Sequence, residues 1–244
     1  MTHSASEASS VPAHVPSRWR WGIGLGVGTL LWGFAVGVAH SFPVLVLDRE
    51  MEGATFAFVA LLFAPLALAA VAIGLRVAGS PMAAAGFTLE RARADALIGA
   101  GVAVAWAALQ FGVLIPLTGG GERADVVVNA QQIGTTYSGL AAFVLLAWGG
   151  GFAEEVFFRA HLMTSLRGML GHSKMASALV VLVPTLLFAL LHGYQGGWVG
   201  MLDTGAFGGL TLSLIFLLRG RLLACVVAHA LWNTIATVVI FRWY

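Results

Sequence analysis

Long apolar segments separated by short polar connections make up almost the whole chain after its first 20 residues. A helix needs about 20 consecutive apolar residues to cross the hydrocarbon core of a bilayer. Seven segments are long enough, and they predict membrane-spanning helices at about residues 21–47, 54–78, 94–118, 136–166, 175–193, 198–218 and 221–242. The fourth segment is longer than one crossing requires, and its Gly149-Gly150-Gly151 run predicts a bend.

The composition supports a membrane protein. The chain is 59% hydrophobic and only 10% charged, whereas soluble proteins carry about 25% charged residues. The predicted fold is therefore all-α, a polytopic transmembrane helix bundle in residues 21–244 with seven spans, eight being the alternative count. Residues 1–20 are polar and rich in Ser, Pro and Ala, and they predict a disordered tail. The apolar segment after them is too long for the core of a signal peptide, so we expect an uncleaved first span.

Positive residues fall mainly on one side of the predicted bundle. If the spans alternate in direction, three positive residues lie on the side away from the amino terminus, and nine lie on its own side: Arg18, Arg20, Arg76, Arg91, Arg93, Arg167, Lys174, Arg219 and Arg221. The positive-inside rule then puts the amino terminus in the cytoplasm and the carboxyl terminus outside. The Ala-, Gly- and Arg-rich composition suggests a bacterial protein, so we expect a multi-pass protein of the plasma (inner) membrane.

Composition also excludes two classes of site. Nucleic-acid binding needs a clustered basic face, but the net charge is only +2 and the arginines are dispersed. The single cysteine, Cys225, cannot form an intramolecular disulfide or a cysteine-based zinc site, and we interpret it as a packing residue. His161, which follows the fourth apolar segment's core, is predicted to lie near a membrane interface.

Two adjacent carboxylates, Glu154 and Glu155, lie inside the fourth apolar segment. An ionised carboxylate is costly in hydrocarbon, so the pair is a candidate functional site. Residues four apart share a helix face, which places Arg159 to neutralise Glu155, while Glu154 points about 100° away around the helix. We therefore expect Glu155 to stay ionised beside Arg159 and Glu154 to face a cavity as a general base.

Further polar residues lie on two other spans. His192 follows Phe188 by four residues, and Asn233 follows His229 by four. At 1.5 Å rise per residue, Glu154 and these three polar residues lie roughly 12–26 Å from the cytoplasmic ends of their helices, with His192 the farthest. These heights agree within side-chain reach and helix tilt, so the residues predict one shared site inside the membrane.

The three motifs read Glu154-Glu155-Val-Phe-Phe-Arg159, Phe188-Ala-Leu-Leu-His192 and His229-Ala-Leu-Trp-Asn233. In order, spacing and membrane context they resemble the CPBP family, which contains the type II CAAX prenyl endopeptidases and the bacteriocin-processing and immunity proteins also called Abi. The resemblance covers about residues 136–240, which would form the catalytic core. Family enzymes with an eight-span core continue beyond the third motif, so the resemblance implies a core without that final helix here.

This resemblance implies an intramembrane endopeptidase of the glutamate type, which hydrolyses a peptide bond without a covalent intermediate. Glu154 and His192 would activate a water molecule, with Glu154 as the general base. His229 and Asn233 would polarise the scissile carbonyl and stabilise the oxyanion.

The resemblance also implies roles for the two remaining motif residues and leaves a metal ion as an alternative. Glu155 and Arg159 would support and orient the site. The family has also been called a metalloprotease family, and Glu154, His192 and His229 could together hold Zn²⁺ with one position open. We expect no catalytic metal or other cofactor, with a divalent metal such as zinc as the alternative.

The expected partners are the lipid bilayer and a membrane-associated peptide or protein substrate, which could be lipidated or carry a C-terminal membrane tag. Two other functions stay open. A catalytically idle scaffold or bacteriocin-immunity protein would share the fold, but it has no need of the complete motif set. A proton-coupled transporter could use buried Glu and His as a relay, but the inverted repeat typical of transporters is not seen.

Overall fold

The computed structural model describes residues 16–244, apart from the side chains of residues 193–196. The described residues are mostly helical and form no strand, which confirms the predicted all-α fold. Among them, the segments long and apolar enough to cross a membrane number seven, as predicted: Arg18–Leu45, Gly53–Ala78, Ala92–Leu117, Tyr137–Leu170, Lys174–His192, Gly197–Arg219 and Leu223–Trp243. The predicted disordered tail falls mainly on residues 1–15, which lie outside the described residues.

The described chain contains ten α-helices: α1 (Arg18–Leu45), α2 (Phe56–Ala78), α3 (Ala92–Leu109), α4 (Ile115–Leu117), α5 (Ala124–Ile133), α6 (Tyr137–Glu155), α7 (Thr164–Leu170), α8 (Lys174–Thr204), α9 (Leu212–Arg219) and α10 (Leu223–Trp243). Three π-helical stretches join parts of longer helices: η3 (Gln110–Leu114), η5 (Val156–Met163) and η6 (Gly205–Thr211). Short 3₁₀ turns occupy connections: η1 (Gly53–Thr55), η2 (Met82–Ala85) and η4 (Gly120–Glu122).

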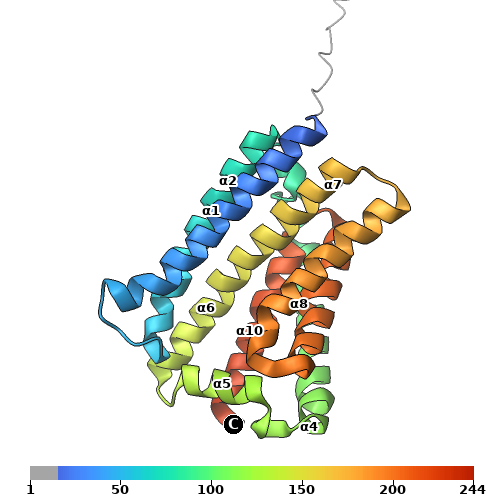
Figure 1. Ribbon diagram of the computed structural model, residues 1–244. Coiled ribbons are helices and arrows are strands. Elements are labelled where there is room, and N and C mark those ends of the chain that lie inside the picture. The colour runs from blue at the N-terminus through green and yellow to red at the C-terminus, as the bar shows by residue number, and fades with distance from the viewer. Residues whose placement is uncertain (1–15) are drawn as a thin grey trace, which may run out of the picture.

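Helix α6 lies at the centre of the bundle (Figure 1). It packs against α2 and α10, while α1 packs along α2 and α3 packs against α10. Its continuation η5 packs against α8. The three helices that carry the motifs are thus neighbours, although α8 and α10 are separated in the sequence by another span.

The glycine run of α6, at which a bend was predicted, does not interrupt the helix, and α6 is continuous through it. The glycines let neighbouring helices approach. A Cβ at Gly149 would lie 2.8 Å from the carbonyl oxygen of Ala60 on α2, and a Cβ at Gly151 would lie 3.5 Å from the ring of His229 on α10. The side chains that follow these glycines can therefore reach across to α10.

A break in α8 shapes the region around the second motif. Gly197 has φ +60° and ψ −159°, a backbone conformation that glycine alone adopts readily. The chain turns back there, so that η6 packs against the earlier part of α8. In this contact Gly205 and Gly209 of η6 face Ala189 and Thr185. Backbone carbonyls of η6 consequently lie close to Arg159, the motif residue of η5.

Helix α5 differs from the spans because it lies crosswise at the end of the bundle where α10 ends (Figure 1). It contacts α8, α10 and α6. The short link to α6 includes Gly134, which has φ +69° and a conformation suited to glycine. The connection between the third and fourth spans is therefore folded across the bundle.

At the other end of the bundle, a buried ion cluster joins α3 to the turn between α9 and α10. Asp95 is fully buried, with its Oδ1 2.8 Å from Nη2 of Arg219 and its Oδ2 2.5 Å from Nε of Arg221. The hydrogen bond to Asp95 also raises the pKa of Arg221 above its ordinary value. Each oxygen of this carboxylate has a cationic partner, so the cluster links α3 to the end of α9 and to the turn that leads into α10.

Candidate active site

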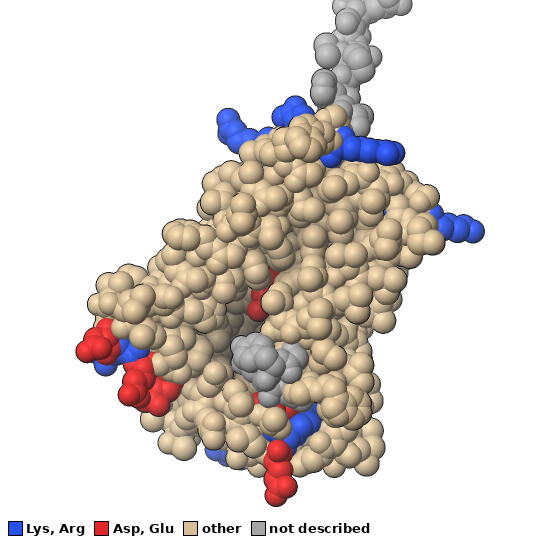
Figure 2. All heavy atoms as spheres, in the orientation of Figure 1, with Lys and Arg blue, Asp and Glu red and all other residues tan. Residues whose placement is uncertain are grey.

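A cavity of about 280 Å³ lies among α6, α8, α10 and α5. Figure 2 shows a hollow on the side of the bundle, away from both ends, with acidic atoms inside it. Most of the wall is apolar, and its larger hydrophobic residues are Val59, Phe63, Phe111, Ile115, Phe143, Leu146, Phe188, Trp232 and Ile240. Four of the predicted site residues also line the cavity: Glu154, His192, His229 and Asn233.

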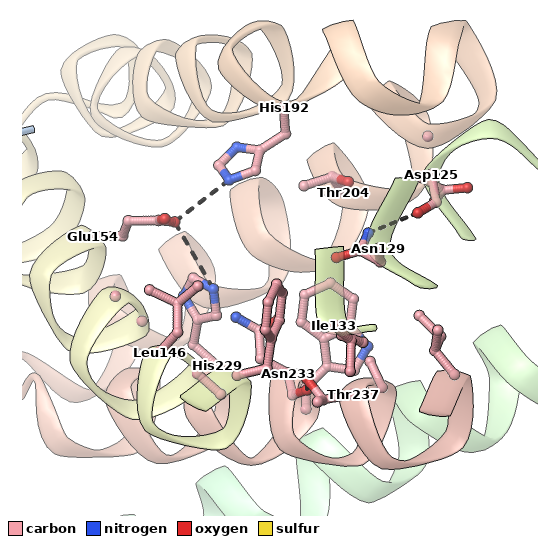
Figure 3. Close-up of a pocket in the computed structure, with 18 of the residues that line it drawn as sticks. Asp125, Asn129, Ile133, Leu146, Glu154, His192, Thr204, His229, Asn233 and Thr237 are labelled. Atoms are coloured by element: carbon pink, nitrogen blue, oxygen red, sulfur yellow. Dashed lines mark hydrogen bonds and ion pairs between the residues drawn. The ribbon is translucent and has the colours of Figure 1, made fainter. Parts of the chain in front are cut away.

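Glu154 points into this cavity between two imidazole rings (Figure 3). Its Oε2 lies 3.6 Å from Nε2 of His192 and 3.9 Å from Nε2 of His229. Both separations are longer than a hydrogen bond and leave room for a small bound molecule to contact the carboxylate and a ring nitrogen. Among the described residues, Oε2 has no hydrogen-bond partner although it is buried. The carboxylate is thus free to take a proton from a bound molecule.

Fixed acceptors orient both imidazole rings. Nδ1 of His192 lies 2.8 Å from the carbonyl oxygen of Phe188, and Nδ1 of His229 lies 2.8 Å from Oε1 of Glu155. A carbonyl or an ionised carboxylate only accepts hydrogen bonds, so Nδ1 donates in both rings. In the neutral form each ring then presents an unprotonated Nε2 to Glu154. Nε2 carries a proton only when the ring is an imidazolium.

Glu155 is the centre of a fully buried polar network. Its Oε1 accepts hydrogen bonds from Nη1 of Arg159 at 2.9 Å and from Nδ1 of His229 at 2.8 Å. Nη2 of Arg159 donates to the carbonyls of Gly208 and Gly209 on η6. Glu155 and Arg159 are both wholly buried. The two adjacent glutamates therefore have the different surroundings that the helix geometry predicts: one is paired, and one faces the cavity.

Phe188 provides an aromatic surface against which the two histidines lie. Its ring stacks on His192 with centroids 4.3 Å apart, and it meets His229 edge to face at 5.8 Å. The guanidinium carbon of Arg159 lies 5.3 Å from the same ring centroid. A Cβ at Gly208 would collide with this ring. Phe188 thus sets the spacing between the histidines, and the glycine of η6 makes room for it.

Asn233 lies one helical turn after His229 on α10, and its side chain points into the same cavity (Figure 3). His192 also reaches Glu154, although the predicted heights placed it farthest from the other residues. All the residues of the three motifs therefore meet at one place.

The polar residues at the other end of the cavity were not predicted from the sequence. Asp125 and Asn129 of α5, Gln110 of η3 and Thr204 of α8 line that end. Gln110 is a polar residue inside an apolar span, and this was the one feature of the sequence that pointed to a second polar group in the membrane. Nothing in the apolar pattern shows that the connection containing α5 folds over the cavity.

His161 is also placed differently from the prediction. It is fully buried, with its Nε2 3.3 Å from the carbonyl oxygen of Leu25. Its ring fits against Gly28 of α1 and Gly74 of α2, where any side chain would collide with it. The interfacial prediction was wrong because the ring is enclosed between α1 and α2 instead of facing the membrane surface.

The donor set Glu154, His192 and His229 is chemically suited to zinc. However, no group of three or more His, Cys, Asp and Glu side chains in the described part of the chain is arranged to hold a metal ion.

Comparison with known proteins gave one match. Residues 136–235 match the family model described as Type II CAAX prenyl endopeptidase Rce1-like. The comparisons with curated proteins and with solved structures gave no match. The matched segment runs from the start of α6 into α10 and includes all three motifs, so it supports a protease in general. Over these residues the chain is similar to the type II CAAX prenyl endopeptidases, which confirms the resemblance drawn from its motifs.

Proposed function

We propose that the protein is an intramembrane endopeptidase of the glutamate type, which hydrolyses a peptide bond of a membrane-associated peptide or protein. The observation that carries this proposal is the position of Glu154, whose unpaired Oε2 faces Nε2 of both His192 and His229 in a cavity open to the side of the bundle. The family match supports a protease in general. The lateral opening would let a substrate enter from the lipid bilayer.

In the proposed reaction a water molecule binds between Glu154 and the two rings. Glu154 takes a proton from this water while the water oxygen attacks the carbonyl carbon of the scissile bond. His192 supports the attack by accepting a hydrogen bond from the water at Nε2, because its Nδ1 proton is committed to the Phe188 carbonyl. The proton held by Glu154 then passes to the leaving amine nitrogen, and the peptide bond breaks without a covalent intermediate.

The negative charge that develops on the carbonyl oxygen during the attack needs hydrogen-bond donors. Asn233 can supply its amide N–H, and His229 can supply Nε2–H when its ring is an imidazolium. Glu155 accepts from Nδ1 of that ring and compensates its charge, while Arg159 holds Glu155 in place. Glu155 and Arg159 therefore act by positioning His229, which explains why one glutamate of the pair is buried away from the cavity.

The proposed location is the plasma membrane, with the amino terminus in the cytoplasm. Figure 2 shows Lys and Arg side chains around the end of the bundle where α1 begins and most of the visible acidic side chains toward the other end, in agreement with the positive-inside rule. In this orientation α5 faces the outside. A cysteine at Asn129, in a Cys225→Ser background, should be labelled by an impermeant maleimide in intact cells, and labelling only after lysis would reverse the orientation.

The test of the function is cleavage of a peptide library by the purified protein in liposomes. Wild-type protein should cleave, His192→Ala should lose most of the rate, and His172→Ala, a histidine outside the cavity, should keep it. Cleavage that survives a chelator supports the metal-free mechanism. Cleavage that a chelator abolishes and Zn²⁺ restores would turn the same residues into metal ligands. If no library peptide is cleaved, or if His192→Ala cleaves at the wild-type rate, the proposal fails for this site.

A further inference from the structure

The helix that carries the first motif changes its form directly after the two glutamates. Helix α6 ends at Glu155, and η5 continues it as a π-helix from Val156. Short π-helical stretches inside longer helices are rare and are frequent at functional sites. The backbone at this change sets the directions in which the side chains of Glu154 and Arg159 leave the helix, so contacts that hold it also position the site.

Trp32 of α1 contacts this part of the helix on both sides of Glu154. Its Nε1 donates a hydrogen bond to the carbonyl oxygen of Ala153 at 3.3 Å. Its ring stacks on the ring of Phe157, with centroids 4.1 Å apart and planes inclined by 17°. Ala153 directly precedes Glu154, and Phe157 lies in the turn that follows it. One side chain therefore holds both the backbone before Glu154 and an aromatic ring after it.

Aromatic contacts also extend from Trp32 to the second motif. Trp32 meets Phe158 edge to face with centroids 6.1 Å apart, and Phe158 meets Phe188 in the same manner at 5.0 Å. Phe188 is the ring on which His192 stacks. Phe158 and Phe188 are both buried, and closely packed interiors transmit a displacement to their neighbours. A shift at Trp32 would therefore reach His192 as well as Glu154.

A second contact fixes α1 along the same helix. Nε2 of His161 in η5 lies 3.3 Å from the carbonyl oxygen of Leu25 and donates to it, because a carbonyl only accepts. The ring of His161 fits against Gly28. Leu25, Gly28 and Trp32 share one face of α1, since residues four and seven apart lie on the same side of a helix. The two hydrogen bonds run in opposite directions between the helices, so α1 cannot slide along η5 without breaking one of them.

We propose that Trp32 is a positioning residue of the active site, whose indole N–H and ring fix the distance between the carboxylate of Glu154 and the imidazole of His192. Trp32 does not line the cavity, so it acts through these residues and not on the substrate. It also lies outside residues 136–235, which the family model matches. The inference rests on the proposed peptidase function and adds to its machinery a residue from the first span.

The first test compares kcat and KM for a cleaved peptide in two variants that Tm shows to be folded. Trp32→Leu removes the N–H and the ring, and because a displacement of about 1 Å can cost about 10²-fold in rate, its kcat should fall by about that factor. Trp32→Phe keeps an aromatic ring and should lose roughly tenfold. KM should stay within about twofold in both, because neither side chain touches substrate. The matched control is Trp19→Leu, at an exposed tryptophan of the same helix, which should change neither constant. An unchanged kcat, or a raised KM alone, would overturn the proposal.

A double-mutant cycle separates positioning from a general loss of packing. In Glu154→Gln the carboxylate that Trp32 positions is already gone. Adding Trp32→Leu should then lower the residual single-turnover rate by less than about threefold, in place of the roughly 10²-fold loss in the wild-type background. Equal losses in the two backgrounds would mean that Trp32 supports the fold without positioning Glu154, and would overturn the inference.

A measurement without substrate distinguishes a failure of this inference from a failure of the peptidase function. Glu154→Cys in a Cys225→Ser background places the chain's only thiol at position 154, where a small neutral thiol reagent can label it. The labelling rate depends on the surroundings of the thiol, so adding Trp32→Leu should change it by at least about threefold, whereas adding Trp19→Leu should not. If the wild-type protein cleaves no peptide, the proposed function fails and this measurement still stands. A labelling rate that Trp32→Leu leaves unchanged would overturn the inference whatever the activity.

Discussion

Two buried ion clusters in this bundle contain similar side chains but differ in what they leave unpaired. At the end near the amino terminus, Asp95 has a cationic partner for each carboxylate oxygen, Arg219 and Arg221. In the centre, Glu155 is paired with Arg159 through one oxygen only, and the adjacent Glu154 has no arginine or lysine partner and faces a cavity. The ion pairs of the first cluster link helices. The second cluster combines such an ion pair with a carboxylate that is free to react.

The difference arises from helix geometry. One arginine four residues away can reach only the glutamate on its own helix face. The second glutamate must find another partner or face a polar space, and α8 and α10 present two imidazoles there. A carboxylate pair with one arginine is thus a better sign of a reactive site than a buried ion pair alone.

The largest expected effect comes from breaking the paired half of the central cluster. Glu155→Ala leaves the buried charge of Arg159 uncompensated, so the free energy of unfolding should fall by about 3–5 kcal/mol. Chemical denaturation in detergent measures it. The double variant Glu155→Gln/Arg159→Met should recover most of this stability but not the activity, because a neutral amide at position 155 accepts from Nδ1 of His229 without compensating the positive charge of its ring. Full activity in the double variant would contradict the charge-compensating role of Glu155.

A smaller effect should follow from forcing the central helices apart. A Cβ at Gly149 would lie 2.8 Å from the backbone oxygen of Ala60, so Gly149→Ala should cost about 1–3 kcal/mol of stability and slow cleavage. Gly26 of α1 is the matched control, because a Cβ there meets nothing within 4 Å. Gly26→Ala should be neutral or stabilising by up to about 1 kcal/mol. Equal effects of the two variants would show that close packing of α6 does not shape the site.

The smallest expected effect on stability comes from the ion cluster of Asp95, Arg219 and Arg221 near the amino terminus. Asp95→Asn leaves Arg219 and Arg221 without their carboxylate, but both are partly open to solvent. We expect Tm to fall by roughly 3 °C and the cleavage rate of the folded protein to stay unchanged. Thermal unfolding and a rate at low temperature measure the two effects. A large loss of rate with an unchanged Tm would mean that this cluster is coupled to the active site.

The sequence was sufficient for the spans and for the three motifs, because apolar length and residue spacing on a helix are local properties. It also predicted that Glu154 and Glu155 would have different surroundings. Contacts between distant segments could not be predicted in this way. The carbonyls of η6 that accept from Arg159, the position of α5 across the cavity and the burial of His161 all depend on how helices fold back on one another. The contacts that the glycines of α6 make with α2 and α10 could not be predicted for the same reason.

The most direct test of the central claim is the cleavage rate of Glu154→Gln beside that of Glu50→Gln, an acidic residue in the connection between α1 and α2, with both variants shown to be folded by their Tm. If Glu154 is the general base, its variant should lose about 10²–10⁴-fold in rate while Tm stays within a few degrees of wild type and Glu50→Gln cleaves normally. A folded Glu154→Gln protein that cleaves as fast as wild type would contradict the account.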